Sequence, residues 1–96
     1  MILDEKNRML LHSVMYRDVL GWEKGVSRLT ANVNEGELFI TLTEKEDGEI
    51  IIDELSRVKL DKNHCALLGW NTRDKISATV EEGNRIKLQM EEKYKL

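Results

Sequence analysis

The sequence predicts a mainly β protein with two short helices, in which two repeats form one small closed barrel. Three observations predict this fold class. The pattern of repeat 1 (residues 1–45) returns in repeat 2 (residues 49–94), so one unit fills the 96-residue chain twice. Each unit holds a short helix-like segment and two segments of alternating apolar residues. A chain of this length can bury one hydrophobic core rather than two, so residues 1–96 are expected to form a single domain.

The repeat rests on matched residues that occur in the same order in both halves of the chain. Their offset changes from 49 to 48 along the unit, so one residue has been gained or lost between Leu11 and Leu20. The matched pairs in the first part of the unit are Ile2 and Ile51, Asp4 and Asp53, Glu5 and Glu54, Arg8 and Arg57, Leu11 and Leu60, Leu20 and Leu68, Gly21 and Gly69, and Trp22 and Trp70.

Each unit begins with a short apolar segment, a polar hinge and a short strand. In repeat 1 the hinge covers residues 4–7, where the polar composition favours a turn. In the strand that follows, Met9 and Leu11 alternate with Arg8 and Leu10, which predicts one inward face. The chain therefore enters its helix from a strand with one buried side.

A short helix follows this strand in each unit. Ser13 is predicted to cap the first helix, because its hydroxyl can accept a hydrogen bond from a free backbone N–H group of the first turn, and Asp61 takes this role in repeat 2. Gly21 and Gly69 are predicted to end the helices. Neither helix is long enough to be stable alone in water, so tertiary packing must hold both. The tryptophans that follow the two glycines are expected to be buried beneath the helix ends.

A hairpin with one buried face closes each unit. Residues 28–33 and 38–42 alternate on either side of a turn at residues 34–36, and residues 76–80 and 86–90 repeat this pattern. Such a hairpin cannot bury its apolar face alone, and open strand edges invite aggregation. The two units are therefore expected to interleave into a closed barrel.

Composition and charge narrow the function classes. The formal net charge is -3, and an acidic chain is a poor general ligand for nucleic acid, whose phosphates are bound by Lys and Arg. A DNA-binding face would therefore have to be a local cluster of Lys and Arg residues. No apolar run is long enough to span a membrane, and the N-terminus lacks a signal-peptide pattern. Cys65 is the only cysteine, which excludes an internal disulfide, so a cytoplasmic location without membrane contact is expected.

Repeat 2 carries an ordered series of features. These are an Asp-x-x-x-Arg hinge from Asp53 to Arg57, a helix that ends at Leu68 and Gly69, and the hairpin that begins at residue 76. This series resembles the AbrB/MazE/SpoVT family of bacterial DNA-binding domains, and its duplication resembles the tandem form found in MraZ-type regulators. The resemblance implies an AbrB-like swapped-hairpin β-barrel, bound to double-stranded DNA as a transcriptional regulator.

The chain also departs from the family pattern. The family usually has Gly before the hinge arginine, where this chain has Asn7 and Ser56, and Asn tolerates left-handed backbone better than Ser. DNA-binding members often carry an Arg-Arg pair in the helix. Repeat 1 keeps only Arg17 of this pair, and repeat 2 keeps neither arginine.

The resemblance implies that basic residues in the hinges and at the helix starts contact DNA. These candidates are Arg8, Arg17, Arg57, Lys59 and Lys62. A guanidinium can bind phosphate or guanine edges, whereas a salt bridge to the hinge aspartate is the other interpretation of Arg8 and Arg57, and both can hold together. Lys59 is expected on the outward side of its strand with Arg57, and Lys62 at the helix start. A solvated face is the alternative interpretation of this patch.

The residues give little indication of a metal site or a catalytic site. His12, His64 and Cys65 lack the spacing of a metal site, and nothing indicates a base that would activate Cys65. No phosphate loop or catalytic motif occurs, so we expect no enzyme, no cofactor and no metal. The alternative function is a protein-interaction module, antitoxin-like or an adaptor, that has lost DNA binding. A homodimer, a separate protein partner and a structural scaffold also remain open.

Overall fold

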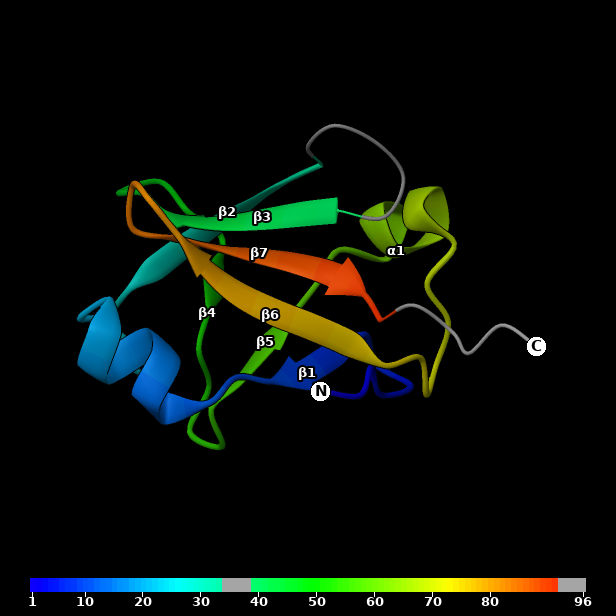
Figure 1. The fold of residues 1–96 in the computed structure, drawn as a ribbon, viewed down its shortest axis with the longest axis horizontal. Coiled ribbons are helices and arrows are strands. Elements are labelled where there is room, and N and C mark those ends of the chain that lie inside the picture. The colour runs from blue at the N-terminus through cyan, green and yellow to red at the C-terminus, as the bar shows by residue number, and fades with distance from the viewer. Residues whose placement is uncertain (34–38, 92–96) are drawn as a thin grey trace.

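The computed structural model describes residues 1–33 and 39–91. The predicted turn at residues 34–36, Leu38 and the chain beyond residue 91 lie outside the described residues. The elements in chain order are β1 (Arg8–Leu10), the helix η1 (Val14–Val19), β2 (Arg28–Val33), β3 (Phe39–Glu44), β4 (Ile50–Ile51), β5 (Arg57–Lys59), α1 (Lys62–Leu68), β6 (Ile76–Glu81) and β7 (Arg85–Met90) (Figure 1).

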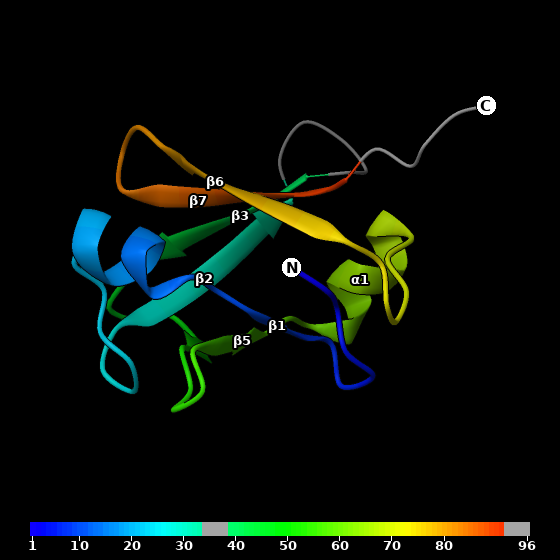
Figure 2. The same ribbon diagram turned by 60° about the horizontal axis from the view of Figure 1, so that its bottom comes forward.

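The strands form two antiparallel sheets. The larger sheet has the order β4-β2-β3-β7-β6, and β1 pairs with β5 in a separate two-stranded ladder. Figure 2 shows the large sheet over the ladder, with η1 at one end of the molecule and α1 at the other. The prediction of a mainly β protein with two short helices is confirmed.

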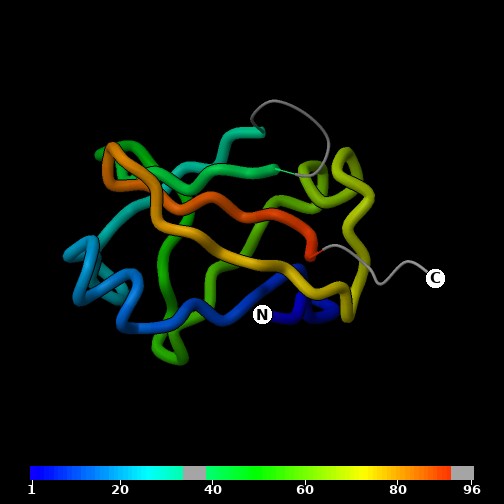
Figure 3. The backbone as a smooth tube through the Cα atoms, in the orientation of Figure 1, coloured from blue at the N-terminus to red at the C-terminus, as the bar shows by residue number. Residues whose placement is uncertain are grey.

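The expected closed barrel is not formed by hydrogen bonds among residues 1–33 and 39–91. β4 pairs with β2, and the chain then turns through a hinge into β5 (Figure 3). The two sheets are therefore connected at this point by the chain itself. In a closed barrel, hydrogen bonds between strands would connect them. The turn is sharp because Ser56, directly before β5, has left-handed backbone with φ 64°. Asn7, directly before β1, has φ 61° and redirects the chain in the same way.

A pseudo-two-fold axis relates the two repeats. Met9 pairs with Val58 at the centre of the ladder, and the two residues correspond at an offset of 49. Ile40 pairs with Leu88 between β3 and β7, and these residues correspond at an offset of 48. Residues that lie opposite their own counterparts mark the axis, which therefore passes through both pairs. Each repeat contributes one strand to the ladder and one hairpin to the large sheet.

The two helices differ because repeat 1 has one more residue. η1 has the wider turn of a π-helix, whereas α1 is an ordinary α-helix. A wider turn accommodates the additional residue without moving the helix ends. Gly21, with φ 75°, and Gly69, with φ 72°, end the two segments in left-handed backbone, as predicted.

The two predicted helix caps have different outcomes. Asp61 is confirmed, because its Oδ1 accepts a hydrogen bond from the N–H of Asn63 at 2.8 Å. Ser13 is wrong as a cap, since its side chain makes no capping hydrogen bond within the described chain. Its backbone, with φ -61° and ψ -32°, is already helical, whereas a capping residue has extended backbone that brings its hydroxyl back to the first turn.

Both repeats contribute to one buried core. Trp22 and Trp70 are buried beneath the helix ends, as predicted. Their backbone N–H groups donate to the carbonyls of Tyr16 at 2.8 Å and of Cys65 at 2.9 Å, which ties each tryptophan to its helix. No helix within residues 1–33 and 39–91 is both long and apolar enough to cross a membrane.

Candidate nucleic-acid interface

Each hinge is closed by its aspartate. Oδ1 of Asp4 accepts hydrogen bonds from the backbone N–H groups of Lys6 and Arg8, both at 2.8 Å. Oδ1 of Asp53 accepts the equivalent bonds in repeat 2, both at 2.9 Å. A short carboxylate that bonds to its own following backbone favours a tight turn over continued strand. The Asp-x-x-x-Arg pattern therefore specifies the hinge locally.

The same aspartates hold the hinge arginines. Nε of Arg8 donates to Oδ2 of Asp4 at 2.8 Å, and Nε of Arg57 donates to Oδ2 of Asp53 at 2.8 Å. The salt-bridge interpretation of both arginines is therefore correct. Because the bond uses Nε, it also fixes the direction of each guanidinium.

Each hinge lies beside the strand and helix start of the other repeat. The carbonyl of Asn7 accepts from the N–H of Leu60 at 2.8 Å, and the carbonyl of Ser56 accepts from the N–H of Leu11 at 2.7 Å. The hydroxyls of Tyr16 and Ser56 are also hydrogen-bonded, at 2.7 Å. The residues that could meet a ligand at one hinge therefore come from both repeats.

Four cationic side chains gather on one side of the ladder. Arg8 lies opposite Lys59 in the register of β1 and β5. Lys6, Lys59 and Lys62 line one open hollow of about 600 Å³. We call Lys6, Arg8, Lys59 and Lys62 the basic half-face. The remaining residues of the hollow are polar, apolar and acidic, namely Asn7, Ile50, Ile51, Leu60, Glu49 and Asp61.

Lys6 is the member of the basic half-face that sequence reasoning missed. It belongs to repeat 1, whereas Lys59 and Lys62 belong to repeat 2. Residues 6 and 62 are brought to one hollow only by the pairing of β1 with β5. The duplication in the sequence could have predicted this contact. If the strands that follow the two hinges pair about a two-fold axis, each hinge lies beside the helix of the other repeat.

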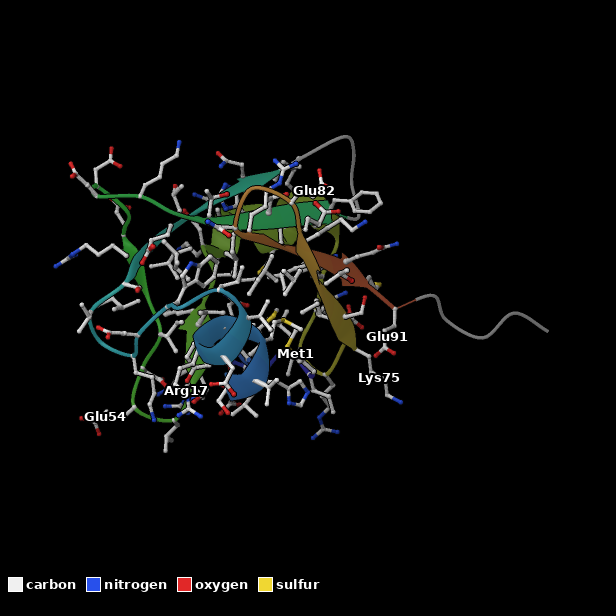
Figure 4. All side chains as sticks on the ribbon, turned by 60° about the vertical axis from the view of Figure 1, so that its left-hand side comes forward. Met1, Arg17, Glu54, Lys75, Glu82 and Glu91 are labelled. Carbon is white, nitrogen blue, oxygen red and sulfur yellow. The ribbon has the colours of Figure 1, made fainter. Side chains whose placement is uncertain are left out.

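Arg57 and Arg17 lie toward the other half of the molecule. Arg57 is outward on β5, as predicted, but its partner across the ladder is Leu10. Arg17 is exposed on η1, and its Nε pairs with Oδ1 of the neighbouring Asp18 at 3.1 Å. Figure 4 shows Arg17 and the hinge residue Glu54 at the same end of the molecule. Arg57 therefore shares the outward face of the ladder with Arg8 and Lys59, whereas Arg17 lies apart from them on η1.

The cysteine and histidine residues do not build a second site. Cys65 is buried, and burial together with the nearby charge of Asp61 raises the pKa of its thiol, which makes it a poor nucleophile at neutral pH. Among the described residues, no group of three or more His, Cys, Asp or Glu side chains is placed to hold a metal ion.

The hinge aspartates predict an acid-sensitive fold. Partial burial alone would raise the pKa of Asp4 and Asp53, but hydrogen bonds from the hinge and the arginine charges outweigh it and lower both pKa values. A carboxylate whose pKa is lower in the folded state stabilises the fold above its unfolded pKa of about 4, and this stabilisation is lost as pH falls through the folded pKa. We expect the melting temperature of the protein to fall steeply below about pH 4.

Thermal unfolding between about pH 2 and pH 7 tests this expectation. Asp4→Asn combined with Asp53→Asn should melt lower at neutral pH and show a flatter pH profile. Asp47→Asn, in the exposed linker, is the matched control and should keep the wild-type profile. A double variant with the full wild-type pH dependence would assign the acid sensitivity to other groups.

Comparisons of the chain with known proteins add no relative. No family model matches it, and neither a curated protein nor a solved structure matches it. The geometry of the hinges, the ladder and the basic half-face therefore carries the functional argument.

Proposed function

We propose that this protein is a cytoplasmic DNA-binding transcriptional regulator of the AbrB/SpoVT type, which contacts double-stranded DNA through its basic half-face. One observation carries the proposal: two repeats of an acidic chain bring four cations together on one side of a single ladder. Phosphate contacts from Lys and Arg supply most of the affinity of such interfaces.

We propose an AbrB-like swapped-hairpin arrangement, with its two sheets left open at the hinges, as the finer description of the fold. The hairpins of the two repeats pair through β3 and β7, so the large sheet is built from both units. The Asp-x-x-x-Arg hinges turn into strands that pair across the pseudo-two-fold axis. This combination is the one implied by the family resemblance of the hinge, helix and hairpin series.

The cations of the half-face have different roles in this proposal. Arg8 is held by Asp4 and presents a fixed planar donor group, which suits a phosphate or a guanine edge. Lys59 and Lys62 are exposed and carry mobile point charges, which suit phosphates. Glu49 and Asp61 in the same hollow limit the area that DNA can approach. Binding should therefore be modest and strongly weakened by salt.

A salt titration with mixed-sequence duplex DNA tests the proposal. Four phosphate contacts predict that log affinity falls with log salt concentration with a slope of about -3.6. Lys59→Ala should flatten the slope by about 0.9 and weaken binding about eightfold at about 0.1 M salt. Lys45→Ala removes the same charge from the exposed linker and should keep the slope. No binding at low salt would refute the function, and equal effects of the two variants would refute the interface.

The protein-interaction module remains the second candidate because of the other half of the ladder. There, Leu10 and Leu55 are exposed at the positions that correspond to Lys59 and Lys6. An antitoxin-like or adaptor protein would use such an apolar surface for a different protein. Isolation of the native complex distinguishes the two functions, since a stoichiometric protein partner without nucleic acid would favour the module.

A further inference from the structure

The pseudo-two-fold axis relates the basic half-face to a surface of opposite character. At an offset of 49, Lys6 corresponds to Leu55, and Leu10 corresponds to Lys59. Val14, at the start of η1, corresponds in the same way to a polar asparagine at the start of α1. We call Leu10, Val14 and Leu55 the apolar half-face.

The side chains of the apolar half-face are exposed, and hydrogen bonds join the elements that carry them. Leu10 is 49% exposed, Val14 63% and Leu55 62%. They come from β1, η1 and the hinge of repeat 2, which are joined by the bond from the Leu11 N–H to the Ser56 carbonyl and by the hydroxyl pair of Ser56 and Tyr16. Clustered apolar side chains on an otherwise charged surface indicate an interaction site.

Charges of both signs surround the apolar half-face. Arg57 pairs with Asp53 at 2.8 Å, and Arg17 pairs with Asp18 at 3.1 Å. Nζ of Lys24 donates to the Glu54 carbonyl at 3.4 Å, so another lysine and glutamate lie there together. Figure 4 shows Glu54 and Arg17 at this end. Three cations and three anions therefore border the surface.

This rim is complementary to a second molecule of the same chain. In an isologous dimer one patch contacts its own copy, so each charge near the axis must meet the opposite sign from the partner. A rim of paired cations and anions can meet that condition by exchanging partners. The basic half-face meets this condition less well, because its four cations outnumber Asp4, Glu49 and Asp61 beside them. The charge balance thus favours the apolar half of the ladder for self-association.

We infer that the apolar half-face is the interface of an isologous homodimer, with Leu10, Val14 and Leu55 at its centre. The inference goes beyond the proposed function and does not depend on it. In such a dimer both basic half-faces stay outside the interface. The dimer would then present two equivalent cationic surfaces related by a two-fold axis, which is the symmetry of a palindromic DNA site.

Sedimentation velocity over about 1 µM to about 1 mM protein tests the inference. The wild-type mass should rise from that of the 11.2 kDa monomer toward twice this value. Leu10→Gln with Leu55→Gln should weaken association more than about tenfold, since burial of two leucines contributes at least this much. Ile2→Gln with Leu67→Gln changes side chains that are 56% and 65% exposed outside the patch, and it should keep the dimer.

A second measurement needs no variant. The amide resonances of residues 10–17 and 54–57 should shift when the wild-type protein is diluted, whereas those of Lys59 and Lys62 should not. A monomer at every concentration would overturn the inference. So would a dimer that survives the Leu10 and Leu55 exchange, or dilution shifts at the basic half-face. Because glutamine adds no charge, DNA titration of this variant tests the proposed function separately.

Discussion

Giving the apolar half-face the lysines of its counterpart is expected to raise affinity for double-stranded DNA about 60-fold at about 0.1 M salt. The variant is Leu10→Lys with Leu55→Lys, which reproduces Lys59 and Lys6 on the other side of the pseudo-two-fold axis. Each added phosphate contact should steepen the salt slope by about 0.9 and tighten binding about eightfold. Fluorescence anisotropy at several salt concentrations measures both quantities.

The matched control adds the same charge elsewhere. Asn32→Lys with Thr79→Lys places two lysines at exposed positions of β2 and β6 in the large sheet. Both double variants change net charge equally, so a general attraction would raise affinity in both. If only the Leu10→Lys and Leu55→Lys variant gains affinity for DNA, the result supports the ladder as the DNA-facing side. Equal gains would refute the proposed interface while leaving the fold and the dimer untouched.

Gly48→Ala is expected to lower the free energy of unfolding by about 3 kcal/mol. Gly48 lies buried in the linker between the repeats, and an added Cβ would be 2.5 Å from the carbonyl oxygen and 2.7 Å from the nitrogen of Leu29. These are backbone atoms of β2, which is paired with β3 on one side and β4 on the other, so they cannot rotate away. Urea denaturation followed by circular dichroism measures the loss.

Gly25→Ala is the matched control for this clash. Gly25 has φ 72°, and an added Cβ there would have no neighbouring atom within 4 Å. Its counterpart Arg73 has φ 76°, so the fold accepts a side chain in this backbone conformation. The substitution should cost about 1 kcal/mol. A Gly48→Ala variant no less stable than Gly25→Ala would show that the linker moves away from β2.

Much of the fold could be predicted from residue patterns because those patterns act locally. Alternating apolar residues identified both hairpins, and the glycines at 21 and 69 located the helix ends. The change of offset detected the extra residue of repeat 1, although not the π-helix that holds it. Ser13 failed as a cap because its backbone is already helical, which composition alone does not reveal.

The candidate site was predicted less completely than the fold. Lys59 and Lys62 were predicted to share a patch with Arg57, but the position of Arg8 beside Lys59 depends on which strand β5 pairs with. The register that sets Arg8 opposite Lys59 also sets Arg57 opposite Leu10. Lys6 reaches the hollow of Lys59 and Lys62 for the same reason. Spacing along one repeat contains no information about a contact made between repeats.

The sequence by itself determined the duplicated unit, the hinge carboxylates and the order of strands and helices, because turns, alternation and short-range hydrogen bonds involve residues close together in the chain. Only the tertiary structure decided that the two sheets of the described chain stay open and that the ladder has a basic and an apolar half. Both follow from the left-handed hinge residues and the pairing of β1 with β5, which bring together side chains about 50 residues apart. Strand pairing over such separations depends on the whole packed core rather than on local preference.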